Sequence, residues 1–180
     1  WAVSTIYSLS IGQGELGVIP LQMANLSATI ANKGHYYVPH LIKQVEGINQ
    51  IPSEYTTKHD VGISTNYINT VIDGMYGVVY EPGGTARRAR IHDSILVCGK
   101  TGTAQNPHGE DHSVFIAFAP KDNPQIAVAV YVENAGGGGS WAAPIAGLMI
   151  EKYLTDTIST RNKVREEHVL KGNFKSPTPY

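Results

Sequence analysis

Three short runs of β-branched and aromatic residues follow one another in the second half of this 180-residue chain, and they constrain its fold most strongly. The runs cover residues 94–103, 112–119 and 125–133. The last two are separated by residues 120–124, whose sequence PKDNP is typical of a turn. Runs of this length and composition predict three consecutive antiparallel strands. Such a sheet is small and has an exposed edge, which segments before residue 1 could complete.

Helical patterns flank these strands. The segment from Pro20 to Gly34 has apolar residues near helical spacing and a proline suited to a first turn. A second such pattern covers residues 64–80 and ends at the Pro-Gly-Gly of 82–84, and a third covers residues 140–154. We therefore expect an α+β fold in which helices cover an antiparallel sheet. We interpret residues 47–60 as a surface connection, residues 1–155 as one domain portion, and residues 156–180 as a polar tail of uncertain order.

Charge and cysteine content exclude several classes of protein. Lys plus Arg total 14 against 15 for Asp plus Glu, so the net charge is −1. The chain therefore lacks the excess of basic residues that is typical of proteins that bind nucleic acid. The only cysteine, Cys98, follows three apolar residues and is expected to be a buried apolar side chain rather than a catalytic thiol. No apolar run approaches the ~18 residues needed to span a bilayer, and the first residues do not resemble a signal peptide. We interpret the chain as a piece of a longer protein.

The segment 99–103, Gly-Lys-Thr-Gly-Thr, carries the strongest chemical signal, and a phosphate-binding loop is its first interpretation. That motif requires glycine at position 94, where the chain has Ser94. It also requires a helix immediately afterwards, but Asn106, Pro107 and Gly109 follow and break helices. Nucleotide binding is therefore disfavoured.

The second interpretation is the Lys-Thr-Gly element of serine acyl-transfer enzymes that bind penicillin, which lies on a strand at the edge of the active site. An edge strand leaves backbone groups free to pair with an extended peptide. Gly102 would let a ligand approach the backbone closely. Lys100, Thr101 and Thr103 offer a cation and hydroxyl donors, which suit a substrate carboxylate.

Five segments, in this order and spacing, resemble the class B penicillin-binding proteins of the elongation type. They are residues 10–14 (SIGQG), 20–24 (PLQMA), 84–86 (GTA), 99–105 (GKTGTAQ) and 112–120 (HSVFIAFAP). The resemblance covers roughly residues 4–154. It implies part of the fold shared by penicillin-binding transpeptidases and serine β-lactamases. It also implies peptidoglycan D,D-transpeptidase activity, in which a D-alanyl-D-alanine peptide acylates a serine and is then transferred to an amine of a neighbouring strand.

The same resemblance implies roles for individual residues. Lys100 would set proton affinities at the serine, and Thr101, Gly102 and Thr103 would line the substrate site. The Thr101 and Thr103 hydroxyls would hold the terminal carboxylate of a stem peptide or a β-lactam, and the Thr103 N–H would be an oxyanion donor. No metal or cofactor is implied. The implied partners are stem peptides, β-lactams, the upstream part of the same chain and cell-wall elongation proteins. The implied location is the cytoplasmic membrane, with the catalytic domain in the periplasm and the membrane anchor outside this chain.

The nucleophile of that family is absent from the chain. It lies in a Ser-x-x-Lys motif, and no lysine here has serine three residues before it. We therefore expect this chain alone to be inactive. The family's Ser-x-Asn motif has one literal match at 64–66, but it lies too close to Lys100, so a helix cap is preferred. A D,D-carboxypeptidase or β-lactamase of the same fold, and a non-catalytic binding module, remain as alternatives.

Three other clusters have structural interpretations that outweigh functional ones. The polar cluster at 108–112 matches no standard zinc spacing, so we expect a solvated loop; its residues are His108, Glu110, Asp111 and His112. The glycines of 136–139 are expected to form a passage from strand to helix rather than an anion cradle. The arginine cluster is expected to be a solvated face, with a substrate-groove role as the weaker alternative; it consists of Arg87, Arg88 and Arg90.

Overall fold

The computed structural model describes residues 2–42 and 51–173. Its elements occur in the order α1 (Val3–Ser10), α2 (Pro20–Ala31), β1 (His35–Tyr36), α3 (Ser53–Thr56), β2 (His59–Asp60), α4 (Thr65–Tyr80), the 3₁₀ helix η1 (Arg87–Ala89), β3 (Cys98–Ala104), β4 (His112–Ala119), β5 (Ile126–Val132), α5 (Ala142–Thr155) and α6 (Thr160–Leu170). The three predicted strands and the three predicted helices are all present. The α+β class is therefore confirmed.

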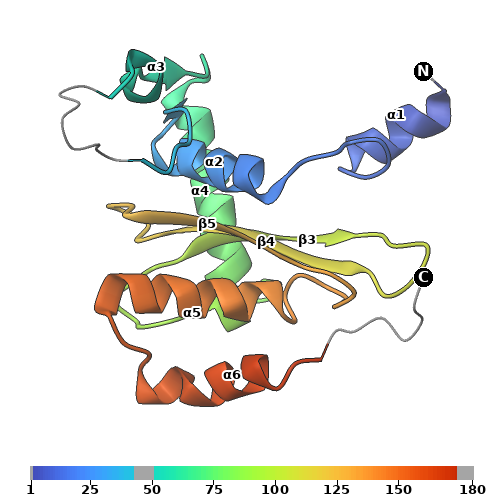
Figure 1. The fold of residues 1–180 in the computed structure, drawn as a ribbon, viewed down its shortest axis with the longest axis vertical. Helices are drawn as coiled ribbons and strands as arrows, with labels where there is room; N and C mark the ends of the chain where they lie inside the picture. Colours follow the sequence, from blue (N-terminus) through green and yellow to red (C-terminus); the bar gives the residue numbers. More distant parts are fainter. Residues whose placement is uncertain (1, 43–50, 174–180) are drawn as a thin grey trace.

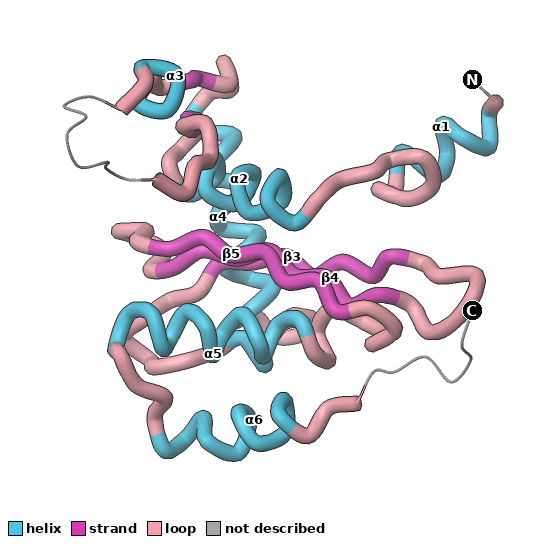
Figure 2. The backbone as a smooth tube through the Cα atoms, in the orientation of Figure 1, coloured by secondary structure: helices cyan, strands magenta, loops and turns pink. Residues whose placement is uncertain are grey.

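The main sheet has the order β3-β4-β5, with both pairings antiparallel. Lys100 lies opposite Ile116, and Phe115 lies opposite Val130. Helix α2 lies on one side of this sheet and α5 on the other, with α6 outside α5, and α4 runs from the α2 side past the level of the sheet (Figure 1). The backbone tube shows the same layers around the three strands (Figure 2). Among the described residues, no helix has the length and apolar character that crossing a membrane requires.

The sheet separates two apolar cores. Successive side chains of a strand point to opposite faces, so β4 contributes Phe115 to one core and Phe118 to the other. The larger core, on the α5 side, includes Phe115, Val130, Ala146 and Ile150. The smaller core, on the α4 side, includes Ile68, Ile72, Met75, Cys98 and Phe118. The Gly-Lys-Thr-Gly-Thr segment, which begins at Gly99, therefore follows directly on the buried Cys98.

The Cys98 thiol is expected to resist alkylation in the folded protein. Cys98 is fully buried, as the sequence indicated, and burial raises its thiol pKa to about 12, so the reactive thiolate is scarce at neutral pH. We expect labelling by a maleimide at pH 7.5 to be at least about 100-fold slower than in denaturant, because reaction must wait for local opening. Rapid labelling of the native protein would contradict this burial.

The polar region after residue 155, whose order the sequence left open, contains the helix α6. The buried Asn162 donates from Nδ2 to Glu151 Oε2 at 2.8 Å. Arg165 Nη1 donates to the Arg90 carbonyl at 2.7 Å, and the His168 ring stacks on Trp141 at 4.5 Å. Residues 174–180 lie outside the described part, and the boundary at residue 155 stays a prediction.

The predicted surface connection at 47–60 contains two short elements. Residues 51–60 include α3 and β2, and β2 pairs antiparallel with β1. Residues 47–50 lie outside the described part of the chain.

Candidate active site

The four residues predicted to form the site are consecutive in β3, at one edge of the main sheet. In the described part of the chain β3 pairs with β4 alone, which leaves its other edge open. Lys100 and Thr103 are exposed, whereas Thr101 and Gly102 are half-buried. The edge strand that the Lys-Thr-Gly interpretation requires is therefore present.

Contacts to the β3 backbone identify the groups that face the open edge. The Thr103 carbonyl accepts a hydrogen bond from Gln13 Nε2 at 2.7 Å, and the Gln105 N–H donates to Gln13 Oε1 at 3.3 Å. The Thr101 carbonyl accepts a hydrogen bond from Lys100 Nζ at 2.7 Å. Since alternate residues of an antiparallel strand direct both backbone groups to the same side, the N–H groups of Thr101 and Thr103 also face the open edge.

The hydroxyl of Thr101 is held by a residue from another segment. Cross-strand partners share a face, so Thr101 and Thr103 lie on the α5 side of the sheet with Phe115 and Ser113. Thr85 lies in the connection between α4 and η1, and its Oγ1 is 2.8 Å from Thr101 Oγ1. This hydrogen bond fixes the position of the Thr101 hydroxyl at the edge.

Two arginines stabilise the connection that carries Thr85. Arg90 donates from Nε to the Val79 carbonyl and from Nη2 to the Tyr80 carbonyl, both at 2.8 Å, which satisfies the C-terminal end of α4. Its guanidinium also lies 5.1 Å from the Tyr80 ring centroid. Arg88 Nη1 donates to the Ser140 carbonyl at 3.4 Å. The expectation of a solvated face is therefore wrong for Arg90, which is half-buried because its donors satisfy helix-terminal carbonyls.

The glycine-rich loop at 136–139 joins β5 to α5 and packs against the strand pair β3-β4. Ser113 Oγ donates to the Gly137 carbonyl at 3.0 Å and accepts from the Ala142 N–H at 3.0 Å. A Cβ atom at Gly138 would overlap the Val114 carbonyl oxygen and lie 2.6 Å from the Gly102 carbonyl oxygen. Only glycine fits against the strand pair at this point. The loop is thus the strand-to-helix passage that the sequence favoured.

A pocket of about 330 Å³ opens beside the end of β3. Its walls come from the segment after α1, from α2 and from the sheet; they include Gly12, Gln13, Met23, Gly102, Thr103 and Val114. The pocket reaches Gly102 and Thr103, and Gly102 places no side chain in it. The site therefore combines an open strand edge with a cavity next to Thr103.

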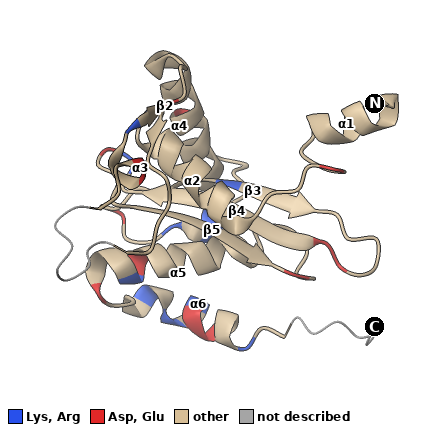
Figure 3. Ribbon diagram, turned by 45° about the horizontal axis from the view of Figure 1, so that its top comes forward, with Lys and Arg blue, Asp and Glu red and all other residues tan. Residues whose placement is uncertain are grey.

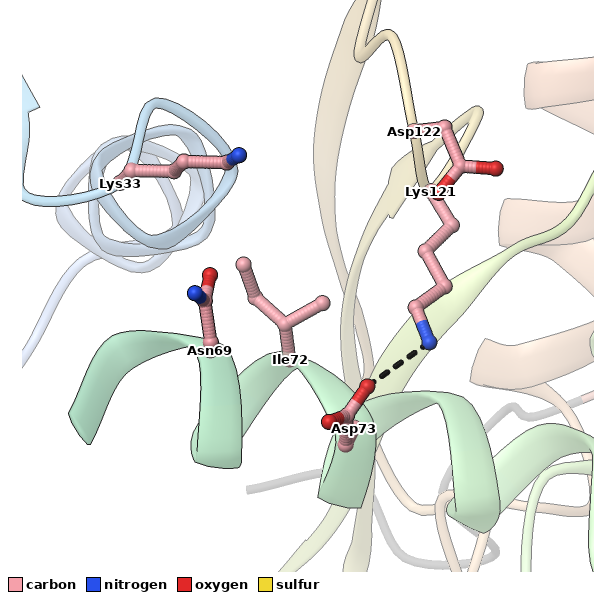
Figure 4. Close-up of a pocket in the computed structure, with 6 residues that line it drawn as sticks. All are labelled: Lys33, Asn69, Ile72, Asp73, Lys121 and Asp122. Carbon is pink, nitrogen blue, oxygen red and sulfur yellow. Dashed lines mark hydrogen bonds and ion pairs between the residues drawn. The ribbon is translucent and has the colours of Figure 1, made fainter. Parts of the chain in front are cut away.

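A second pocket of about 260 Å³ lies near the other end of the sheet, beside the turn after β4 (Figure 4). Lys121 Nζ is 2.8 Å from Asp73 Oδ1 and lies 4.5 Å from the Tyr76 ring centroid. The hydrogen bond from Lys121 to Asp73 raises the pKa of this lysine. None of the predicted site residues lines this pocket.

The remaining candidate clusters have structural roles. The Asp111 carbonyl accepts the Ala135 N–H at 3.0 Å, and His112 Nδ1 accepts the Asn134 N–H at 3.1 Å, so this loop is tied to the end of β5. Throughout residues 2–42 and 51–173, no three His, Cys, Asp or Glu side chains are arranged to hold a metal ion. Ser64 occupies the position before α4, as predicted for a cap, but its side chain makes no capping hydrogen bond. In Figure 3, α6 carries basic and acidic residues together.

Comparison with known proteins decides the family. The model of the penicillin binding protein transpeptidase domain matches residues 1–151. The chain belongs to this transpeptidase family. The domain is 36% identical over 176 residues to the peptidoglycan D,D-transpeptidase MrdA of Haemophilus influenzae, covering 88% of this chain and 27% of the relative. It therefore spans about a quarter of that relative's length.

Solved structures confirm the fold of this transpeptidase domain. Pseudomonas aeruginosa PBP2 in complex with WCK 5153 has a TM-score of 0.75 at 36% identity, covering 89% of this chain and 35% of that chain. Penicillin-binding protein A from M. tuberculosis, an imipenem acyl-enzyme complex, has a TM-score of 0.68 at 32% identity, covering 82% and 33%. PBP2 in complex with MreC from Helicobacter pylori has a TM-score of 0.66 at 26% identity, covering 87% and 28%.

Two residues that contact the open edge of β3 or a side chain on it were not assigned a role from the sequence. Gln13 and Thr85 both lie in segments that resemble the family, but nothing in the local sequence shows that they contact β3. Gln13 is 90 residues from Thr103, and Thr85 is 16 residues from Thr101. Their contribution depends on tertiary contacts.

Proposed function

We propose that this chain forms the Lys-Thr-Gly side of the active site of a peptidoglycan D,D-transpeptidase. The observation that supports this most directly is the open edge of β3, where Thr101 and Thr103 present backbone groups and where Lys100 Nζ lies on the Thr101 carbonyl. An extended stem peptide pairs with such an edge as an added strand.

The geometry supports separate roles for the site residues. The Thr103 N–H is directed outward and stabilises the negative oxygen that develops in the tetrahedral intermediate. The hydroxyls of Thr101 and Thr103, together with the Lys100 ammonium, bind the terminal carboxylate of a stem peptide or of a β-lactam. Lys100 also favours deprotonation of the attacking serine, because a nearby cation stabilises the more negative form.

The proposed reaction requires a nucleophile from the part of the protein that precedes residue 1. A serine hydroxyl there loses its proton to a neighbouring base and attacks the carbonyl of the penultimate D-alanine. The terminal D-alanine leaves with a proton on its amine. An amine of a neighbouring stem peptide then attacks the ester carbonyl and forms the new amide, while the ester C–O bond breaks and the proton of the attacking amine passes through the base to the serine oxygen. We propose that the 180 residues alone cannot form this ester, since they contain no Ser-x-x-Lys.

Partners and location extend the same proposal. The imipenem acyl-enzyme of M. tuberculosis penicillin-binding protein A supports acylation by β-lactams. The complex of H. pylori PBP2 with MreC supports a cell-wall elongation protein as a partner of the whole protein. We place the whole protein at the cytoplasmic membrane with its catalytic domain in the periplasm.

The test is covalent labelling of the full-length protein by a fluorescent penicillin. We expect a label that survives denaturation, and we expect Lys100→Met to slow its formation at least about tenfold, because a cation is lost from the charged site. The matched control is Lys33→Met, which removes an exposed lysine that follows α2 and lines the second pocket, and which should label at the wild-type rate.

Two results would contradict the proposal: a folded full-length protein that takes no label, or efficient labelling of the 180-residue chain alone. Product analysis with a stem peptide and an acceptor amine separates transfer from hydrolysis. Release of free peptide without cross-linked product would favour the carboxypeptidase alternative.

A further inference from the structure

Helix α6 docks on α5 through a pair of buried polar side chains. Asn162 Nδ2 donates to Glu151 Oε2 at 2.8 Å, and these residues are 1% and 2% exposed. Buried polar groups that are fully paired favour one arrangement of the elements that carry them. The family model matches residues 1–151, so α6 lies beyond the part of the chain that it covers. The contribution of α6 therefore has to be inferred from its contacts.

Arg165 connects α6 to the loop that carries Thr85. This arginine is half-buried, and its Nη1 donates to the Arg90 carbonyl at 2.7 Å. Arg90 ends the loop 81–90, which begins directly after α4. Thr85 in this loop has its Oγ1 at 2.8 Å from Thr101 Oγ1. Only one loop thus separates α6 from the hydroxyl on the strand edge.

The loop 81–90 is tied to α4 as a closed unit. The Arg90 side chain donates to two carbonyls at the end of α4, both at 2.8 Å. The Ala86 N–H donates to the Val78 carbonyl at 3.0 Å, and Ala86 is fully buried in the larger core. Segments that are packed and hydrogen-bonded in this way move as rigid pieces. A displacement at Arg90 is therefore passed on to Thr85.

Two glycines receive the side of the loop that faces α5. A Cβ atom at Gly139 would overlap the Thr85 carbonyl oxygen, and one at Gly147 of α5 would lie 2.8 Å from the Ala89 carbonyl oxygen. The loop backbone therefore packs directly on glycine backbone, without a side chain between them. This close fit defines the position of Thr85 only as long as the loop stays pressed against α5.

We infer that Arg165 is a positioning residue that holds the loop 81–90 against α5 and thereby sets the Thr101 hydroxyl for the terminal carboxylate of the acyl donor. The inference rests on the proposed transpeptidase function. Without the Arg165 hydrogen bond, the loop loses its contact with α6 and can move away from α5. Thr85 then no longer holds Thr101 Oγ1 in one place, so the donor carboxylate meets a less well oriented hydroxyl.

The test is a double-mutant cycle in the full-length protein, with the second-order rate of acylation by a fluorescent penicillin as the readout. We expect Arg165→Met to slow acylation about fivefold, because small displacements of a binding group are costly. In a Thr85→Ala background the contact with Thr101 is already absent. There we expect Arg165→Met to change the rate by less than about twofold, whereas a general structural effect would act equally in both backgrounds.

A second pair of variants keeps the inference testable if Arg165→Met does not fold. Burial lowers the pKa of Arg165 and the Glu151 carboxylate opposes this effect, so loss of the arginine leaves a buried carboxylate without this cation. Glu151→Gln combined with Arg165→Met removes both charges, and the new amide oxygen still accepts from Asn162. Glu151→Gln alone should acylate like wild type. The combined variant should show the fivefold loss, again only when Thr85 is present.

The matched control is Arg161→Met, on the same helix. Arg161 pairs with Asp93 at 3.4 Å where both side chains are exposed, so this variant should acylate like wild type. All rates are compared at a temperature at which melting curves show the variants folded. Wild-type rates for Arg165→Met, or an equal loss with and without the Thr85 hydroxyl, would overturn the inference. If the wild-type protein itself forms no acyl-enzyme, the proposed function fails instead.

Discussion

Replacing Thr103 with proline is expected to slow acylation of the full-length protein by about 100- to 1,000-fold, the usual cost of losing one oxyanion donor. The Thr103 N–H points to the open edge, because the Thr103 carbonyl beside it is bonded by Gln13 and not by β4. Proline therefore removes no hydrogen bond of the β3-β4 pair, and edge strands tolerate it. Second-order acylation rates with a fluorescent penicillin provide the measurement.

The comparison variant is Thr103→Ala, which retains the N–H and loses only the hydroxyl. We expect it to acylate about tenfold more slowly than wild type, in line with the loss of one hydrogen bond to a charged group. Circular dichroism and thermal melting should show both variants folded. If Thr103→Pro acylated as fast as Thr103→Ala, the Thr103 N–H would have no part in oxyanion stabilisation.

Gly138→Ala is expected to lower the free energy of unfolding by about 2–3 kcal/mol, as for other overpacked sites. A Cβ atom here meets the carbonyl oxygens of Val114 and Gly102, which belong to a rigid strand pair and cannot move aside cheaply. We expect the melting temperature to fall by several degrees. Acylation should also slow below that temperature, because the displaced loop pushes on the strand that carries Thr103.

Gly137→Ala provides the control for this prediction, one residue earlier in the same loop. Its new Cβ would have Thr103 Oγ1 as its nearest neighbour, at 3.9 Å, which is an ordinary contact. We expect a change of less than about 1 kcal/mol, as for most substitutions that create no overlap. Equal destabilisation by the two substitutions would show that the loop, rather than the close approach at Gly138, is sensitive.

Local sequence patterns predicted the layers of the fold because those patterns arise from burial. Periodic apolar residues identified α2, α4 and α5, and β-branched runs identified the three strands. The first strand was predicted to begin at Ser94, whereas β3 begins at Cys98. The reason is that the Val97 N–H donates to Tyr80 Oη at 3.3 Å and the Leu96 carbonyl accepts the Lys121 N–H at 2.9 Å, so these groups do not pair with β4.

The helix α6 was not predicted because its contacts are polar. Asn162 and Arg165 dock it through hydrogen bonds to Glu151 and to the Arg90 carbonyl, so no apolar stripe marks its inner face. A strand over Lys100 to Thr103 was predicted correctly, because its β-branched residues are a local pattern, whereas the roles of these residues stay a prediction. Gln13 and Thr85 could not be assigned, because their roles depend on contacts that only the folded chain creates.

The open edge of β3 also bears on how such a site can change under drug selection. Its outward backbone groups include the N–H and carbonyl of Thr101 and the N–H of Thr103, and every residue except proline supplies such an N–H. Point mutations at these positions alter hydroxyls but leave the backbone groups in place. Under the proposed function, we therefore expect substitutions that shift the whole strand to be one route by which an inhibitor that pairs with this edge loses affinity. Among those described above, Gln13, Thr85 and Gly138 contact β3 directly, so sequence surveillance for resistance should extend to them.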